Sequence, residues 1–424
     1  MQNIFFRKIL KSSFNRNILV LSGGTIIAQV IVVLTTPILS RLFNNPEAFG
    51  LLALFSSYSV IIGCLSTGKY ELALFLPKED KDALNIITGI SIIAILFSLL
   101  CYIVFALCHN CFKSNTLLES GYVYYVFMII IVIALYSSLQ LWFQRKKEYK
   151  IVSMTAIIQS SITVLSSILL CIKGDRIFGL IEGYILGMTS GFLIMLTLFY
   201  KKGYFLTMGK DISFIDIKKI LLKYKSFPRT ILISEFLVIL SQQFLPILFS
   251  FFYADVATGY LSLSTRMLKL PIIVIAGSFW GVYRNEIIEL QNNNRSIEYT
   301  YMSTLKKLFV IGIVPFLLLS LFAPNLFAFF LGKDWIVSGF YSQFLCIAFF
   351  FDFIAFPLSS TFIVKNKPYL YFRIQLISIF VSIAAIYLGY ILFKNPLQSI
   401  LFYSIGVSVV NVTSLGFSYK LSRV

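Results

Sequence analysis

The sequence is a succession of apolar stretches, each close to the length that crosses a lipid bilayer. A transmembrane helix needs about 20 mostly apolar residues, and such stretches recur along the whole chain. With 58% hydrophobic and 13% charged residues, the composition excludes a soluble globular protein of 424 residues. We therefore predict an all-α integral membrane protein with about twelve spans, at residues 18–39, 49–70, 83–108, 121–143, 151–172, 178–200, 229–250, 258–283, 307–330, 338–363, 369–393 and 397–419.

Lysine and arginine are distributed unequally between the two sets of loops. Every second flank, counted from the N-terminus, collects 28 of the 36 basic residues, whereas the opposite flanks hold 6. Because positive charge accumulates on the cytoplasmic side of membrane proteins, we expect both termini in the cytoplasm. The basic segment 201–228 is then a cytoplasmic linker between two six-helix bundles, 1–200 and 229–424. The excess of basic residues is read as topology, and no nucleic-acid partner is expected.

The two halves of the chain repeat each other. An offset of 209 places Pro37-Ile-Leu over Pro246-Ile-Leu and Gly50 over Gly259, with eight identities in eighteen columns. Each half holds six spans, and an even number returns the chain to the same side of the membrane. The halves are therefore predicted to be parallel repeats.

Two cations lie inside one predicted span. Arg266 and Lys269 fall within residues 259–283 and, three positions apart, share one helix face. A cation at this depth normally faces a water-filled cavity or a partner charge. The cavity interpretation makes these residues ligands of an anion, and the alternative is a buried ion pair with Asp352, the most deeply placed carboxylate elsewhere in the chain.

Four other charged or metal-binding features carry weaker signals. Lys69 pairs with Glu71 or lines a path near one interface, while Arg41 is an interface anchor or lines a path near the other. Glu235 is less deep than Asp352 and could reach the interface. The run Cys108-His-Asn-Cys111 lacks the second pair of ligands of a zinc site, so neither a metal nor a cofactor is expected.

Several sequence blocks resemble one family in that family's order. They are TPILSRLFNNPEAFGLLALFSS with GKYELALFLPKEDKDA, LQLWFQRKKEYKIVSMTAIIQS, YKSFPRTILISEF with QQFLPILFSFFYADVATGYLSLSTRMLKLP, and FFLGKDWIVSGFYSQF with FPLSSTFIVKNK. They resemble the bacterial polysaccharide and O-antigen repeat-unit flippases, the Wzx-type members of the multidrug/oligosaccharidyl-lipid/polysaccharide exporter (MOP) superfamily. The resemblance covers essentially the whole chain.

This resemblance implies two six-helix bundles around a V-shaped central cavity that opens alternately to either side. It implies a flippase, not an enzyme, that moves undecaprenyl-pyrophosphate-linked oligosaccharides from the cytoplasmic to the periplasmic leaflet of the bacterial inner membrane. The products would be O-antigen (in lipopolysaccharide), capsule or exopolysaccharide. Coupling to a proton or sodium gradient is implied as well, and a polysaccharide polymerase and a chain-length regulator are the protein partners expected.

The charged residues fit that interpretation. A pyrophosphate needs fixed cationic donors along its path through hydrocarbon, so Arg266 and Lys269 are predicted to bind it, with Lys69 and Arg41 as weaker candidates. Asp352, and more weakly Glu235, would couple an ion or partner the cations. The alternatives are a multidrug or organic-cation exporter of the same superfamily, which would favour an anionic cavity, and a membrane glycan polymerase or ligase, which would need a larger outer loop.

Overall fold

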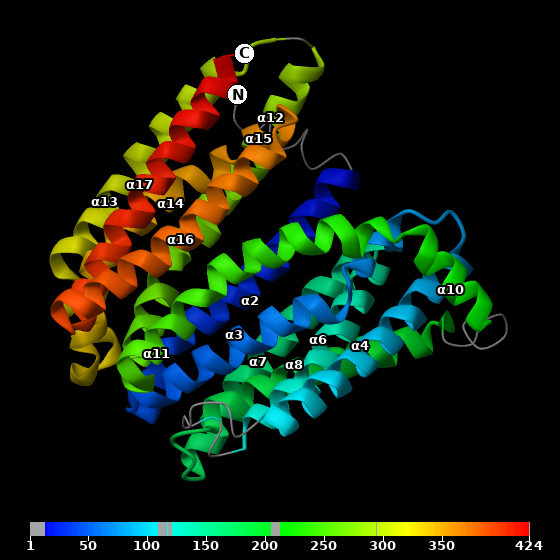
Figure 1. Cartoon of the computed structure of the whole chain (residues 1–424), viewed down its shortest axis with the longest axis horizontal. Coiled ribbons are helices and arrows are strands. Elements are labelled where there is room, and N and C mark those ends of the chain that lie inside the picture. Colours follow the sequence, from blue (N-terminus) through cyan, green and yellow to red (C-terminus); the bar gives the residue numbers. More distant parts are fainter. Residues whose placement is uncertain (1–12, 109–116, 118–120, 205–212, 294, 424) are drawn as a thin grey trace. The chain divides into compact units, whose positions relative to one another are not determined.

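The computed structural model describes residues 13–108, 117, 121–204, 213–293 and 295–423, and its secondary structure there is entirely helical (Figure 1). Several consecutive long helices, such as α2 and α3 or α16 and α17, are joined by short turns, as expected for a multi-pass membrane protein. In chain order the elements are α2 (Ser13–Phe43), α3 (Pro46–Ser66), η1 (Tyr70–Phe75), α4 (Asp80–Cys108), α6 (Val123–Arg145), α7 (Tyr149–Ile172), α8 (Gly179–Lys201), α10 (Phe214–Lys223), η3 (Phe227–Ile231), α11 (Leu232–Pro271), η4 (Ile272–Ala276), α12 (Gly277–Asn292), α13 (Glu298–Leu331), η5 (Lys333–Trp335), α14 (Ile336–Leu358), α15 (Ser360–Val364), α16 (Pro368–Phe393) and α17 (Pro396–Arg423).

The predicted spans are confirmed with one difference in how they are counted. In the described ranges, 11 helical segments are long and apolar enough to cross a membrane. One of them, Phe227–Asn292, is 66 residues long and contains two predicted spans, 229–250 and 258–283. These two are separated at Ala254, whose φ of 70° and ψ of 172° are not helical. The all-α integral membrane fold with about twelve spans is therefore confirmed.

The second span is shorter than predicted. Helix α3 ends at Ser66, whereas the sequence placed the end of the span at residue 70. Gly68 and Lys69 both adopt a left-handed backbone conformation with φ of 58°, and a 3₁₀-helix, η1, follows them. Since a residue with a Cβ rarely adopts this conformation, Lys69 marks a sharp break between α3 and η1.

Residue contacts divide the chain into two compact units. The first is Met1–Thr35 with Leu54–Gln243, and the second is Thr36–Ala53 with Phe244–Val424. In the first unit α6 packs against α4 and α8, and α7 packs against α8; in the second, α14 packs against α13 and α17, and α16 against α17. Each unit has its own apolar core. The boundaries of the two six-helix bundles at 201–228 stay a prediction.

Small residues allow helices of the first unit to approach closely. A Cβ added to Gly183 would lie 2.0 Å from the hydroxyl of Ser167, and one added to Gly187 would lie 1.8 Å from the hydroxyl of Thr163, so α8 lies against α7 at backbone distance. Gly24 meets Ser153 in the same way, because its added Cβ would lie 2.3 Å from the Ser153 Cβ. In a membrane, where burial of apolar surface does not drive helices together, such close packing supplies the attraction.

Candidate functional site

Helix α11 carries both cations of the predicted pyrophosphate site. Beyond the break at Ala254 the helix runs to Pro271, and a π-helical turn, η4, continues it into α12. At about 1.5 Å of rise per residue, Arg266 and Lys269 lie roughly 18 and 22 Å beyond that break. Both residues therefore lie well inside the span, at a depth where hydrocarbon does not solvate a cation.

Arg266, Lys269 and Asp352 all belong to the second unit. Arg266 is half-buried, whereas Lys269 and Asp352, the latter on α14, are exposed. The charges of Lys269 and Asp352 act on each other, yet none of the ion pairs within 4.0 Å among the described residues includes any of the three. The structure thus holds two cations without a direct carboxylate contact, and the predicted binding role of these residues stays a prediction.

The charge of Asp352 also acts on two tyrosines. Tyr371 on α16 and Tyr403 on α17 both lie within electrostatic reach of its carboxylate. A tyrosine hydroxyl can donate to a carboxylate or exchange hydrogen bonds with a sugar hydroxyl. Four helices of the second unit, α11, α14, α16 and α17, therefore contribute polar groups to one region. The two tyrosines were not among the residues predicted from the sequence.

Arg41 has a structural partner in the same unit. Its Nη2 donates to the carbonyl oxygen of Phe329 at 2.5 Å, close to the C-terminal end of α13. The adjacent Ser40 donates to the carbonyl oxygen of Leu331 at 3.0 Å, and the indole of Trp335 donates to the carbonyl oxygen of Ser40 at 3.2 Å. Because the last carbonyl groups of a helix have no partner within it, this geometry favours the anchor interpretation of Arg41.

Lys69 is surrounded by carboxylates. Its ammonium lies 3.6 Å from Oε1 of Glu71 and 4.0 Å from Oε2 of Glu235, all three residues being in the first unit. Glu71 has only 7% of its side chain exposed, and its second oxygen, Oε2, has no hydrogen-bond partner among the described residues. The sequence offered the pairing with Glu71 as one of two alternatives, but it did not indicate that Glu235 would also reach Lys69. This cluster carries one more negative than positive charge, so Lys69 is a poor candidate for an anion site in this arrangement.

The described residues contain no group of three or more His, Cys, Asp and Glu that could hold a metal ion. His109 and Cys111 of the Cys-His-Asn-Cys run lie outside the described residues.

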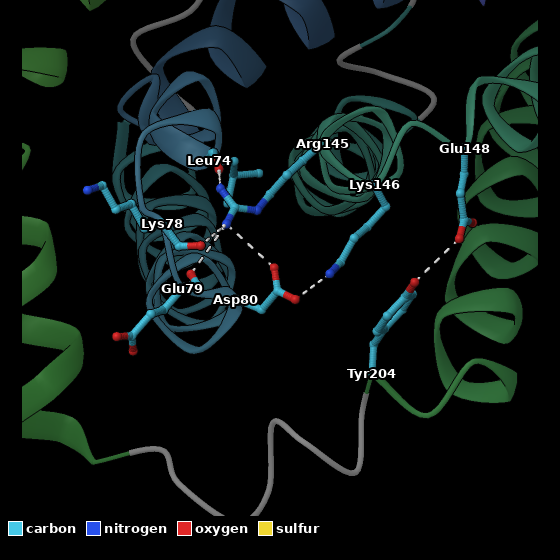
Figure 2. A network of polar contacts seen from close by, with 8 residues as sticks. All are labelled: Leu74, Lys78, Glu79, Asp80, Arg145, Lys146, Glu148 and Tyr204. Atoms are coloured by element: carbon cyan, nitrogen blue, oxygen red, sulfur yellow. Dashed lines mark hydrogen bonds and ion pairs between the residues drawn. The ribbon is translucent and has the colours of Figure 1, made fainter. Parts of the chain in front are cut away.

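Arg145, at the end of α6, forms hydrogen bonds with the segment that leads into α4 (Figure 2). Its Nη1 donates to the carbonyl oxygen of Leu74 at 2.7 Å, and its Nη2 makes longer contacts of 3.4 Å with the carbonyl oxygens of Lys78 and Glu79. The same Nη2 lies 3.5 Å from Oδ1 of Asp80, the first residue of α4. One guanidinium therefore contacts three carbonyl oxygens and one carboxylate between η1 and the start of α4.

The neighbouring charges extend this network across three helices (Figure 2). Lys146 forms an ion pair with Asp80 and lies over the ring of Tyr204, 5.6 Å from its centroid. Tyr204 donates to Glu148 at 3.4 Å, and Glu148 pairs with Lys202 at 2.7 Å. The hydrogen bond with Glu148 raises the pKa of the Lys202 ammonium. In the sequence these basic residues indicated only topology. The available signal for the network was a run of three basic residues at the end of one span and two aspartates at the start of another.

The paired glycines of the repeat meet each other in the second unit. A Cβ added to Gly50 on α3 would lie 2.0 Å from the carbonyl oxygen of Asp255, and one added to Gly259 on α11 would lie 1.7 Å from the carbonyl oxygen of Pro46. Under the offset of 209, Pro46 corresponds to Asp255 and Gly50 to Gly259, so the two contacts are equivalent. We refer to this pair of contacts as the glycine crossing. Only glycine leaves room for backbones this close.

Comparison with known sequences establishes the family. The sequence model of the family described as polysaccharide biosynthesis protein matches residues 14–283, well over half of the 424 residues. The chain belongs to this polysaccharide biosynthesis family. The family resemblance predicted from the sequence blocks is thereby confirmed, and the matched residues include both cations of α11 but not Asp352. Among curated proteins, none matches the sequence significantly.

Solved structures show that this member of the family has the MOP superfamily fold. The lipid II flippase MurJ in an inward closed conformation matches with a TM-score of 0.71 at 16% identity, covering 95% of this chain and 87% of MurJ. An inward-facing multidrug resistance MATE family transporter matches with a TM-score of 0.63 at 14% identity, covering 94% and 93%. A MOP superfamily transporter from Pyrococcus furiosus, for which reversed polarity of the binding pocket suggests a different function, matches with a TM-score of 0.59 at 14% identity, covering 97% and 96%.

Proposed function

We propose that this chain is a flippase that moves undecaprenyl-pyrophosphate-linked oligosaccharides across the bacterial inner membrane. The oligosaccharides are repeat units of O-antigen, capsule or exopolysaccharide, and alternating access carries them from the cytoplasmic to the periplasmic leaflet. Membership of the polysaccharide biosynthesis family and the MOP fold support this proposal. In this arrangement both termini are cytoplasmic, and a polymerase and a chain-length regulator would receive the translocated product.

The observation that carries the proposal is the pair of cations in the second segment of α11. An unpaired cation costs about 2.5 kcal/mol or more at the centre of a membrane, and neither Arg266 nor Lys269 has a carboxylate within 4.0 Å among the described residues. An anionic substrate would recover this cost. The planar guanidinium of Arg266 can bind two phosphate oxygens, and the flexible ammonium of Lys269 can follow a moving charge.

Asp352 supports release in this scheme. Its carboxylate already acts on Lys269 at longer range, so a substrate phosphate and Asp352 would compete for the same ammonium. Binding of a proton or sodium ion to Asp352 would weaken that competition and favour capture of the substrate. Glu235 is a less suitable coupling residue because it already contributes to the cluster around Lys69.

The other functions considered fit less well. An organic-cation exporter needs negative counter-charges in its path, whereas α11 carries two cations that have no carboxylate within 4.0 Å in the part of the chain that the structure describes. A polymerase or ligase needs acid, base or arginine groups on a sizeable outer loop. The matching solved structures of MurJ and of a MATE family transporter are named as a flippase and a transporter, which supports transport rather than catalysis.

The test is complementation of a strain deleted for its own repeat-unit flippase, with surface glycan as the readout. We expect Arg266→Ala and Lys269→Ala to abolish or strongly reduce the glycan at matched membrane levels, and Lys306→Ala, an exposed cation near the start of α13, to leave it unchanged. Asp352→Asn should reduce the dependence of transport on the ion gradient. If wild type complements and both α11 variants complement equally well, the proposed pyrophosphate role is wrong.

A further inference from the structure

Helix α10 carries apolar side chains on two faces. One face packs against the rest of the first unit, and the other is not covered by described residues. The helix begins at a Ser213 N-cap, whose hydroxyl accepts a hydrogen bond from the backbone N–H of Ile215 at 3.3 Å, and runs from Phe214 to Lys223. One face carries the buried side chains of Ile217 and Ile220. The opposite face, which we call the outer face of α10, is exposed.

The buried face holds α10 against the first unit. Leu221 packs so closely on α4 that a Cβ added to Gly89 would lie 2.9 Å from one of its methyl groups. The hydroxyl of Tyr70 donates to the carbonyl oxygen of Leu221 at 3.2 Å, which ties α10 to η1 as well. Figure 1 shows α10 beside α4. These contacts fix the direction in which the outer face points.

The contact with Gly89 also sets the depth of α10. Helix α4 has 29 residues, about 43 Å at 1.5 Å per residue, and so exceeds the roughly 30 Å hydrocarbon core by several turns. Gly89 lies nine residues after Asp80, about 13 Å along the helix, and the apolar sequence begins at Ala83. Because Gly89 lies six residues, about 9 Å, beyond Ala83, Leu221 lies about as deep as the apolar faces of amphipathic helices insert at a membrane interface.

The outer face combines apolar and basic side chains. Phe214, Ile215 and Leu222 are 72%, 75% and 57% exposed, and Lys218 and Lys219 beside them are exposed as well. At 100° per residue, Ile215 and Leu222 are on the side away from Ile217 and Ile220. Exposed apolar groups at an interface depth are suited to contact acyl chains, and the lysines among them are suited to contact anionic headgroups.

We propose that the outer face of α10 binds the anionic phospholipids of the leaflet on its own side of the membrane. Phe214, Ile215 and Leu222 insert at the boundary between headgroups and acyl chains, and Lys218 and Lys219 contact the phosphate headgroups. This inference does not rest on the proposed transport function, since it follows from the depth and the composition of α10. It assigns a lipid-binding role to a segment between the two halves of the sequence.

The experiment places a fluorescent probe on the outer face in the full-length protein. The Ile215→Cys variant, labelled with an environment-sensitive nitrobenzoxadiazole dye, is reconstituted in phosphatidylcholine vesicles with and without phosphatidylglycerol. The unsubstituted chain, treated identically, corrects for labelling of native cysteines. Quenching by brominated acyl chains reports lipid contact, and quenching by iodide reports exposure to water. We expect strong bromine quenching that increases with phosphatidylglycerol and decreases with added salt.

The charge contribution is tested by the Lys218→Gln/Lys219→Gln double variant. Each lysine near an anionic surface contributes roughly fivefold to binding, so its loss should shift the equilibrium from lipid contact to water exposure by roughly 30-fold. The Lys306→Gln/Lys307→Gln double variant changes two adjacent exposed lysines on α13 and should leave the probe unaffected. The proposal is overturned if the probe is quenched by iodide and not by brominated lipid, or if phosphatidylglycerol and the lysine variant have no effect.

Discussion

Replacing either glycine of the glycine crossing by alanine should force α3 and α11 apart. The added Cβ would lie 1.7 Å from the Pro46 carbonyl oxygen in Gly259→Ala and 2.0 Å from the Asp255 carbonyl oxygen in Gly50→Ala, whereas ordinary contact begins at 3.4 Å. Both obstructing atoms belong to the backbone, so no side-chain rotation relieves the overlap. The helices must separate locally by about 1.5 Å, which costs approximately 1–3 kcal/mol, as overpacking of a tightly packed interface does.

Alanine also favours the helix over glycine by about 1 kcal/mol, so the comparison needs a glycine with free space. Gly281 on α12 is such a position, because no atom of the described residues lies within 4 Å of its added Cβ. Unfolding in mixed micelles should therefore show Gly50→Ala and Gly259→Ala to be about 1–3 kcal/mol less stable than Gly281→Ala. The double variant should cost less than the sum of the two, since one separation of the helices relieves both contacts.

The same substitutions should affect the conformational equilibrium. A penalty of 1–3 kcal/mol on the packed crossing is a 5- to 150-fold shift toward states in which it is separated. A cysteine at Ser262, whose hydroxyl reaches the carbonyl oxygen of Phe49 at 3.3 Å, should then react correspondingly faster with a membrane-impermeant maleimide in the Gly259→Ala background. Equal stability of all three single variants, with an unchanged labelling rate, would refute the reasoning.

Two further predictions concern the first unit. Glu71→Gln should destabilise the protein more than Glu235→Gln, because the Glu71 side chain is 7% exposed and that of Glu235 is 48% exposed. In the same unfolding assay we expect a loss of about 2 kcal/mol or more for Glu71→Gln and of about 1 kcal/mol or less for Glu235→Gln. Equal losses would contradict a buried pair of Lys69 and Glu71. Arg145→Ala should cost about 1.5–3 kcal/mol by removing a charged donor from the Leu74 carbonyl oxygen. Arg145→Lys should recover little of this, because an ammonium cannot reach several carbonyl groups at once, and full recovery would show that charge alone matters.

The spans could be predicted from the sequence because hydrocarbon thickness imposes a length on every apolar stretch. The lengths of the apolar stretches do not predict where the backbone of a helix is interrupted. The end of α3 at Ser66 depends on two left-handed residues, Gly68 and Lys69, and the lysine gives no local signal for that conformation. The break at Ala254 was likewise predictable only as a loop between two spans.

For the charged residues, too, some properties could be predicted from the sequence and others could not. Their presence and depth followed from the sequence, whereas their partners depend on which helices pack together. Lys69 meets Glu71, two residues away, and also Glu235, on a helix that follows more than 160 residues later. No spacing rule indicates the second contact. The reciprocal contact of Gly50 and Gly259 is the opposite case, because the repeat already paired these glycines.

The repeat also shows where the two halves stop being equivalent. Under the offset of 209, Arg266 corresponds to Ser57 and Lys269 to Val60. Ser57 donates to the side-chain oxygen of Gln243 at 3.3 Å, so the equivalent site in the first half is polar but uncharged. A repeat can place the same packing contacts twice, but a lipid headgroup is one ligand without twofold symmetry. Under the function proposed above, a single headgroup needs cations on one half only, and a second unpaired pair would add the cost of two more charges in the membrane.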